Sequence, residues 1–422
     1  MRHLILASLL AAPLTAQSVT RADPAGAGAD PQRLARIGAM LDSSIARGQL
    51  VGAVALVMRD GVVVYERAAG MADREAARAM TPATRFRIAS QTKAITSVAV
   101  MMLVEEGRVN LSDPVSRWIP NFGGAGVLLA PAKAGDPPTA AKLTRTPTVR
   151  DLLTHAAGLS YGTEAHVRDA YAAQGLGPNA GYGWYLADKT VPVCAVMDRL
   201  ATLPLVAQPG ERFVYGYATD VLGCIVERAS GIPFDRFLAE RIFTPLAMQD
   251  TGFCVESHEA DQLAAVYAAR DGVLVRADTG ARGQGHYVAG VSPCTTFAGG
   301  AGLVSTARDY ARFLEMLRQG GALEGARILA PATVALMTRD HLGSVYGGPE
   351  VGFGLGFEVW TAPAMAARPG EPGQYGWGGA YATTYWVDPA SRLVAVLMTQ
   401  LLPAGDRQLH EKYRMAVYQA LR

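Results

Sequence analysis

The apolar positions of the chain change their spacing near residue 50. Upstream, residues 31–50 carry apolar side chains at the three- and four-residue spacing of an amphipathic helix: Leu34, Ile37, Met40, Leu41 and Ile45. Downstream, the β-rich runs Ala53–Met58 and Val62–Tyr65 flank Asp60-Gly61. This dipeptide tolerates the positive φ values of a tight turn, so the pattern predicts a β-hairpin after the first helix.

Helical and β patterns alternate again further along the chain. The dense apolar run Ile95–Leu103 predicts a centrally buried helix that starts at Ser90 and ends before Gly107. Thr306 and Asp309 form a capping-box signal before a periodic segment at 310–317. The last third predicts three strands, at Gly352–Trp360, Thr383–Val387 and Leu393–Met398, with a turn at Asp388–Ser391 between the last two. A helix at Arg407–Leu421 closes the chain.

These elements predict an α+β fold with one mostly antiparallel sheet built from both ends of the chain. We expect residues 30–110 and 295–422 to form this α/β domain. Residues 111–294, where short helical pieces alternate with Gly-, Pro- and Ala-rich loops, would form a separate, mainly helical domain. The polar stretch 130–148 is expected to be irregular.

Composition excludes some classes of function. The chain has 422 residues, is half hydrophobic and carries a formal net charge of +2, without the basic stripe that nucleic-acid binding needs. Residues 1–16 have a basic start, a short apolar stretch and small residues, as in a signal peptide, although a frayed helix of a cytosolic protein is the alternative. No apolar run is long enough to span a bilayer. We therefore expect a periplasmic or secreted protein, either a monomer or a small homo-oligomer.

Four cysteines are compatible with disulfides in an exported protein. Cys254 and Cys294 lie in loop-like contexts and are the better candidates for a bridge. Cys224 lies in an apolar run and is more simply interpreted as a small buried side chain, while Cys194 has no assigned partner. None of them has the spacing of a metal site, so neither a metal nor another cofactor is expected.

Ser90 and Lys93 are the strongest chemical signal in the sequence. Three residues apart on a helix, they share one face, where an amine can take the proton of a serine that is otherwise a weak nucleophile. The spacing alone is common by chance, and an exposed serine and lysine at a helix start would look the same. Arginine could not replace the lysine, because it does not lose its proton in proteins.

Further motifs follow in the order of a known family. They are Asp151–Leu159, Tyr215 before Asp220–Gly223, Gly299–Thr306 and Trp377-Gly378-Gly379. With Ser90-Gln91-Thr92-Lys93, they make the chain resemble the serine hydrolases of the class C β-lactamase and penicillin-binding-protein superfamily. Within that superfamily it is most similar to the family VIII carboxylesterases, which have a β-lactamase fold. The resemblance extends from about residue 31 to the C-terminus.

The resemblance implies a site and an activity. Ser90 would be the nucleophile, Lys93 and Tyr215 its base system, and the N–H groups of Ser90 and Ala380 the oxyanion hole. Which of Lys93 and Tyr215 takes the proton stays open. The implied enzyme is a serine carboxylesterase that cleaves short-to-medium acyl esters of small molecules through an acyl-enzyme on Ser90.

Two departures from the lactamase pattern bear on the substrate. The third motif, Lys-Thr-Gly in the lactamases, is Trp377-Gly378-Gly379 here, and tryptophan offers an apolar face in place of a cation. The second motif, Tyr-x-Asn, is Tyr215-Gly216-Tyr217 and lacks the asparagine. Both losses favour neutral esters. We expect Trp377, Gly378, Gly379 and Tyr217 to contact the substrate.

Other interpretations stay open. A β-lactamase or D-Ala-D-Ala-type peptidase of the same fold, an acyltransferase and a ligand-binding protein without turnover would share these motifs. Gly158-Leu159-Ser160-Tyr161-Gly162 matches the nucleophile elbow of α/β-hydrolases, with His286, His341 or His410 as possible partners. That elbow needs a strand before the serine, whereas residues 148–155 favour a capped helical turn. His155, Tyr215 and Trp377 could each be packing residues only.

Overall fold

The computed structural model describes residues 20–422 except 132, 134–135, 181–185, 187–188, 278–286, 290–293 and 404–406. Its main feature is an eight-stranded sheet, antiparallel throughout, in the order β12-β13-β14-β15-β16-β1-β2-β3. In chain order its strands are β1 (Gly52–Arg59), β2 (Val62–Asp73), β3 (Arg78–Ala79), β12 (Val351–Phe353), β13 (Glu358–Trp360), β14 (Tyr375–Gly378), β15 (Thr384–Asp388) and β16 (Leu393–Met398).

The predicted sheet built from both chain ends is confirmed. β1 pairs with β16 from Val54 opposite Met398 to Arg59 opposite Leu393, so strands about 340 residues apart are neighbours at its centre. The β1–β2 hairpin turns at Asp60 and Gly61, both with positive φ, as the sequence predicts.

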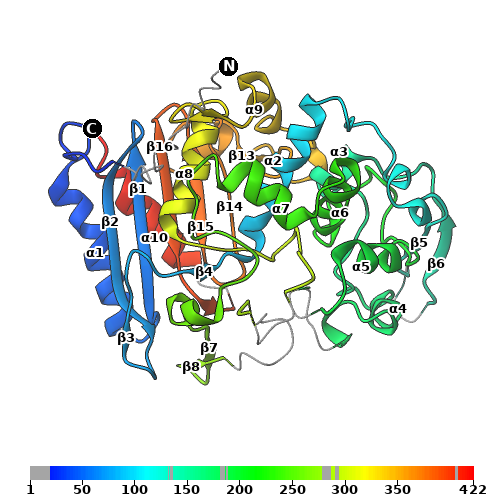
Figure 1. Cartoon of the computed structure of the whole chain (residues 1–422), viewed down its shortest axis with the longest axis horizontal. Coiled ribbons are helices and arrows are strands. Elements are labelled where there is room, and N and C mark those ends of the chain that lie inside the picture. Colours follow the sequence, from blue (N-terminus) through cyan, green and yellow to red (C-terminus); the bar gives the residue numbers. More distant parts are fainter. Residues whose placement is uncertain are drawn as a thin grey trace, which may run out of the picture.

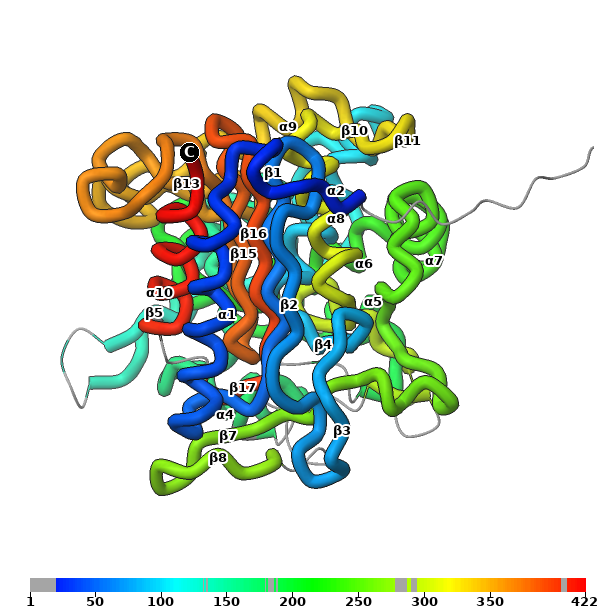
Figure 2. Tube along the Cα trace, turned by 90° about the vertical axis from the view of Figure 1, so that its left-hand side faces the viewer, coloured from blue at the N-terminus to red at the C-terminus, as the bar shows by residue number. Residues whose placement is uncertain are grey.

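Both faces of this sheet are covered. Alternate residues of β1 belong to separate hydrophobic clusters, with Ala53, Ala55 and Val57 packing towards α1 (Pro31–Ala46) and α10 (Arg407–Tyr418). Val54, Leu56 and Met58 pack towards α2 (Thr92–Glu105) and α8 (Ala307–Arg318). Figure 2 shows α1 and α10 on one side of the strands and α8 on the other. The sheet is therefore apolar on both faces, and α2 lies in the larger core.

The helices of the middle of the chain are α3 (Val149–Leu153), α4 (Arg168–Ala173), α5 (Val193–Leu200), α6 (Ala218–Ser230) and α7 (Phe234–Leu238). One more short helix, α9 (Pro331–Met337), belongs to the last third. The strands outside the main sheet are short and form smaller sheets: β4 (Phe86–Arg87), β5 (Gly126–Leu129), β6 (Thr139–Lys142), β7 (Tyr267–Arg270), β8 (Val273–Arg276), β9 (Val304–Ser305), β10 (Ala322–Leu323), β11 (Ala326–Arg327) and β17 (Leu401–Leu402). The segments from β5 to α6 gather at the end of the molecule away from α1 and β2, whereas β7 and β8 lie at the lower edge, where β7 pairs with β17 (Figure 1). Where the chain divides into domains stays a prediction.

Three expectations need correction. The single strand expected at 352–360 is two strands, β12 and β13, which pair with each other around Gly354–Phe357. The stretch 130–148 contains β6, which pairs with β5. Cys224 is not a free buried thiol, because it bonds to Cys194, with the two Cα atoms 4.9 Å apart. The expected Cys254–Cys294 bridge is present, with the Cα atoms 6.2 Å apart.

The expected signal peptide, residues 1–16, lies outside the described residues. Within the described part of the chain, no helix has the length and apolar character needed to cross a bilayer.

Candidate active site

Ser90 lies at a strained turn between a short strand and a buried helix. β4 ends at Arg87, Ala89 has a φ of 44°, and a 3₁₀ turn at Ala89–Gln91 leads into α2. A left-handed residue with a Cβ costs about 1–2 kcal/mol, so packing must hold Ala89 in place. Gly379 contributes to that packing, since a Cβ on it would lie 2.5 Å from the carbonyl oxygen of Ile88. The third motif therefore presses directly on the backbone before Ser90.

Lys93 is held in the core beside Ser90. Its side chain is on α2, of which every residue from Thr92 to Leu103 is buried, and Lys93 itself is 3% exposed. The Nζ atom lies 3.2 Å from Ser90 Oγ, 3.1 Å from Tyr161 Oη and 2.6 Å from the carbonyl oxygen of Gly300. Among the described residues, no carboxylate forms an ion pair with it. The amine is thus desolvated, directed by two oxygen acceptors and within reach of the serine proton.

Tyr215 lies on the other side of the amine. Lys93 Nζ is 4.6 Å from the centroid of its ring. Trp377 Nε1 donates a hydrogen bond to Tyr215 Oη at 3.1 Å. Because the indole occupies the oxygen as an acceptor, the proton of Tyr215 is free to be donated elsewhere. Tyr215 and Trp377, which the sequence suggested separately as site residues, are therefore brought together by a hydrogen bond that the sequence did not predict.

Aromatic rings continue from Trp377 as a wall. Tyr215 and Phe353 contact Trp377 with ring centroids 5.6 Å away in each case, and Phe213 and Tyr346 pack on Phe353. Phe213, Tyr215, Tyr346 and Trp377 stay partly exposed. The wall offers apolar ring faces to a ligand near Ser90.

The residues expected to form the oxyanion hole lie where β14 meets the turn of Ser90. Ala380 is half-buried and packs in a small cluster with Ala89 and Tyr381. In the described structure its N–H has no protein acceptor. Ser90 is in the first turn of a helix, where N–H groups lack intrahelical partners. The oxyanion role of both N–H groups stays a prediction.

Tyr217 does not lie at a surface that a substrate can reach. Its side chain is fully buried at the start of α6, and its hydroxyl accepts the N–H of Gly177 at 3.0 Å. Its ring packs behind Tyr161, with centroids 4.9 Å apart. Burial raises the pKa of Tyr217, with the negative charge of Asp220 adding to the effect. The expected substrate contact is therefore replaced by support for Tyr161, because α6 starts here and turns the side chain inward.

Two groups near Lys93 were not identified from the sequence. Tyr161, which bonds to Lys93, was seen only as part of the rival serine motif. Asp220 was noted only as a motif letter, but it is 2% exposed and accepts the N–H of Gly300 through Oδ1 at 2.9 Å. Burial raises the pKa of Asp220 to about 6, against the lowering effects of Lys93 and of the Gly300 N–H.

The rival Ser160 has the contacts of a structural residue. It is fully buried, donates to Glu164 and accepts the N–H of Gly162 at 2.7 Å. The helix α3, not a strand, precedes it. His341 and His410 bond to backbone carbonyls of Leu336 and Ala382, and His286 lies outside the described residues. The contacts of Ser160 therefore differ from those of a nucleophile elbow.

His155 is a packing residue with a defined charge state. Burial holds the pKa of His155 well below its usual value, and Lys93 in its protonated form lowers it further. Its ring packs on Tyr215 with centroids 4.8 Å apart. A neutral ring therefore supports the tyrosine.

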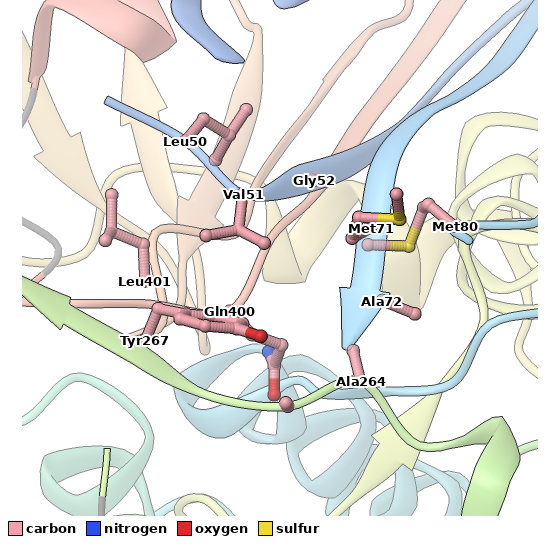
Figure 3. A pocket seen from close by; sticks show the side chains of 11 residues that line it. Leu50, Val51, Gly52, Met71, Ala72, Met80, Ala264, Tyr267, Gln400 and Leu401 are labelled. Carbon is pink, nitrogen blue, oxygen red and sulfur yellow. The ribbon is translucent and has the colours of Figure 1, made fainter. Parts of the chain in front are cut away.

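A hollow away from Ser90 has Met71 and Met80 on one side and Tyr267 and Gln400 on another, and none of the motif residues line it (Figure 3). Its volume of about 10 Å³ fits roughly one water molecule.

The comparison with known protein families agrees with this geometry. The family model described as Beta-lactamase matches residues 35–419, nearly the whole described chain. The chain belongs to the β-lactamase family. With its serine and lysine side by side, it is a serine hydrolase of that family.

Several relatives cover most of the chain. Esterase EstB of Burkholderia gladioli is 34% identical over 400 residues, 91% of this chain and 94% of EstB. Protein Rv1367c of Mycobacterium tuberculosis is 37% identical over 368 residues, 84% of this chain and 87% of that protein. Among solved structures, EstCE1, a hydrolase with promiscuous acyltransferase activity, matches with a TM-score of 0.76 and 32% identity, covering 92% of this chain and 99% of EstCE1. The antiparallel β-lactamase fold is thereby confirmed.

Proposed function

We propose that this family member is a carboxylesterase that cleaves short-to-medium acyl esters of uncharged small molecules through an acyl-enzyme on Ser90. The observation that carries the proposal is the contact of Lys93 Nζ with Ser90 Oγ at 3.2 Å, in a core that excludes water from the amine. The likeness to EstB and EstCE1 supports ester chemistry, and Trp377 in place of a lysine supports an uncharged substrate.

In the proposed reaction Lys93 takes the serine proton. Ser90 Oγ bonds to the acyl carbon, its O–H proton moves to Lys93 Nζ, and the carbonyl electron pair moves to the oxygen held by the N–H groups of Ser90 and Ala380. The C–O bond to the alcohol then breaks, and the alkoxide takes a proton from Tyr215. Tyr215 suits this step because its oxygen accepts from Trp377 while its own proton stays available. Water reverses the sequence on the acyl-enzyme.

The first test is the site of covalent labelling. Brief exposure to a phosphonate ester, followed by intact mass and peptide mapping, should place one label on Ser90. Ser90→Ala should lose at least about 1,000-fold in hydrolysis of a nitrophenyl ester while keeping its fold, because the nucleophile is gone. Ser160→Ala is the matched control and should stay active. A label on Ser160, or turnover retained without Ser90, would refute the mechanism.

Acyl transfer to an alcohol is the second candidate activity, favoured by the likeness to EstCE1. It uses the same acyl-enzyme, with an alcohol replacing water. Product analysis in the presence of a primary alcohol distinguishes the two.

We also propose export of the protein. The leader-like residues 1–16 and the two disulfides support it, since disulfides persist in oxidising compartments. Sequencing the mature N-terminus should give Gln17 as the first residue, and a mature protein that starts at Met1 would contradict the proposal.

A further inference from the structure

Asp220 is a buried carboxylate without an ion-pair partner in the described part of the chain. It lies in the first turn of α6, 2% exposed, and Oδ1 accepts the N–H of Gly300 at 2.9 Å. A buried acid costs free energy unless something compensates its charge, so a carboxylate whose hydrogen bonds come only from peptide N–H groups, those of Gly300 and of Asp220 itself, calls for a reason.

The same peptide segment connects Asp220 to Lys93. Gly300 donates its N–H to Asp220, and its carbonyl oxygen accepts from Lys93 Nζ at 2.6 Å. Hydrogen bonds in a chain polarise one another, and the effect is strongest where the dielectric is low. Residue 300 must be glycine for this approach, because a Cβ there would lie 2.5 Å from Asp220 Oδ2.

We propose that Asp220 is a positioning residue that, through Gly300, holds Lys93 against Ser90 and stabilises the ammonium that Lys93 becomes on taking the serine proton. The inference rests on the proposed acyl-enzyme mechanism. The proton leaves Ser90 Oγ for Lys93 Nζ, the serine electron pair forms the new bond, and Asp220 stays ionised throughout. The arrangement serves the purpose of the aspartate in a Ser-His-Asp triad, which orients the base and stabilises its charged form.

Few other charges act on Asp220. Lys93 on α2 and Tyr217 at the start of α6 are the titratable groups of the described chain that interact with it. His155, on the far side of Lys93, is neutral because burial lowers its pKa. On the other helices packed against α6, three charged groups have ion-pair partners: Asp151 with Arg145, Asp198 with Arg228 and Arg236 with Glu240. Arg150, Arg199 and Asp235 of the same helices form no ion pair in the described chain, and none of them is among the charges that act on Asp220.

The test compares two buried acids in the full mature protein. Asp220→Asn keeps the size of the side chain and removes the charge. Asp309→Asn is the matched control, because burial raises the pKa of Asp309 to about 6 as it does for Asp220, but Asp309 accepts from Asp250 and Thr251, away from Lys93. The measurement is the rate of phosphonate labelling of Ser90 between pH 4.5 and 9, followed by mass.

For the native protein and Asp309→Asn we expect the rate to rise through an acid limb near pH 6. In Asp220→Asn that limb, which reflects the ionisation of Asp220, should disappear, and the maximal rate should fall at least about tenfold, the factor that corresponds to one pKa unit of differential stabilisation. A native profile in Asp220→Asn would overturn the proposal. A uniform loss with an unmoved limb would also overturn it, because that is the result of a purely structural role.

Two outcomes separate this inference from the proposed function. Absence of label on Ser90 in the native protein would refute both, whereas label on Ser90 with an unchanged Asp220→Asn profile refutes the role of Asp220 alone. Should Asp220→Asn fail to fold, Asp220→Glu and Asp220→Ala replace it. The glutamate variant should keep the acid limb and the alanine variant should lose it, while identical limbs in both would refute the proposal.

Discussion

Trp377→Phe isolates the hydrogen bond between the third motif and Tyr215. Phenylalanine keeps an aromatic ring between Tyr215 and Phe353 but removes the Nε1–H that reaches Tyr215 Oη at 3.1 Å. A hydrogen bond of this kind contributes a net ~0.5–1.5 kcal/mol. If the bond supports Tyr215 as it gives up its proton, kcat should fall between about twofold and thirteenfold, with little change in KM.

The assay is hydrolysis of benzyl acetate in a pH-stat, for the native protein, Trp377→Phe, Tyr215→Phe and the double variant. The two substitutions should be strongly non-additive, because without the tyrosine hydroxyl the indole N–H has nothing to bind. Trp386→Phe is the control for loss of a tryptophan, since Trp386 lies on the neighbouring strand and packs towards α10. Its kcat should be native.

The reasoning fails if Trp377→Phe costs as much in the Tyr215→Phe background as in the native protein. Trp377 would then act by packing alone. An unchanged kcat in the single variant would equally remove the hydrogen bond from the mechanism.

Three further predictions concern the substrate, pH and the disulfides. Trp377→Lys should lower kcat/KM for neutral esters and strengthen binding of a penicillin, measured as its inhibition constant; no change in either would make Trp377 a packing residue. Burial raises the pKa of Asp309 to about 6, so the folded protein favours the protonated form of this side chain. That preference contributes up to about 3 kcal/mol to the free energy of unfolding below about pH 4, and the contribution is lost as the pH rises through 6. In urea titrations between pH 4 and 6, the free energy of unfolding of Asp309→Asn should fall less with pH than that of the native protein. An equal fall in both proteins would contradict this prediction. Replacing Cys194 and Cys224 with alanine should lower the free energy of unfolding by about 3–4 kcal/mol, the entropic value for a loop with a sequence separation of 30, and an unchanged urea midpoint would refute it.

Local chemistry explains which parts of the fold could be predicted. The Asp60-Gly61 hairpin and the strand Leu393–Met398 were found because their turn residues and β-rich runs are self-contained. The break between β12 and β13 was missed because apolar residues alternate with Gly352, Gly354 and Gly356, so the apolar pattern continues through the turn between the two strands. β6 was missed because Thr139–Lys142 has little β propensity and forms a strand only by pairing with β5.

The same distinction applies to the site. Ser90 lies in the 3₁₀ turn that continues into α2 and Lys93 in the first turn of α2, so their contact follows from their spacing. Tyr161 bonds to Lys93 from a segment 68 residues further along the chain, and Asp220, a further 59 residues on, reaches it through Gly300. Nothing in the neighbourhood of either residue in the sequence indicates this arrangement. Tyr217 was misassigned because the motif gives its position but not the direction that the start of α6 imposes on its side chain.

The pairing of β1 with β16 also has a consequence for biosynthesis. Ser90 and Lys93, the proposed nucleophile and base, are translated within the first quarter of the chain, but the strand that completes the centre of the sheet is finished only at Met398. Contacts between such distant segments form slowly, because the intervening loop must close first. A ribosome-bound chain therefore holds Ser90 for most of translation without a sheet to support it, and activity should appear only after the chain is released.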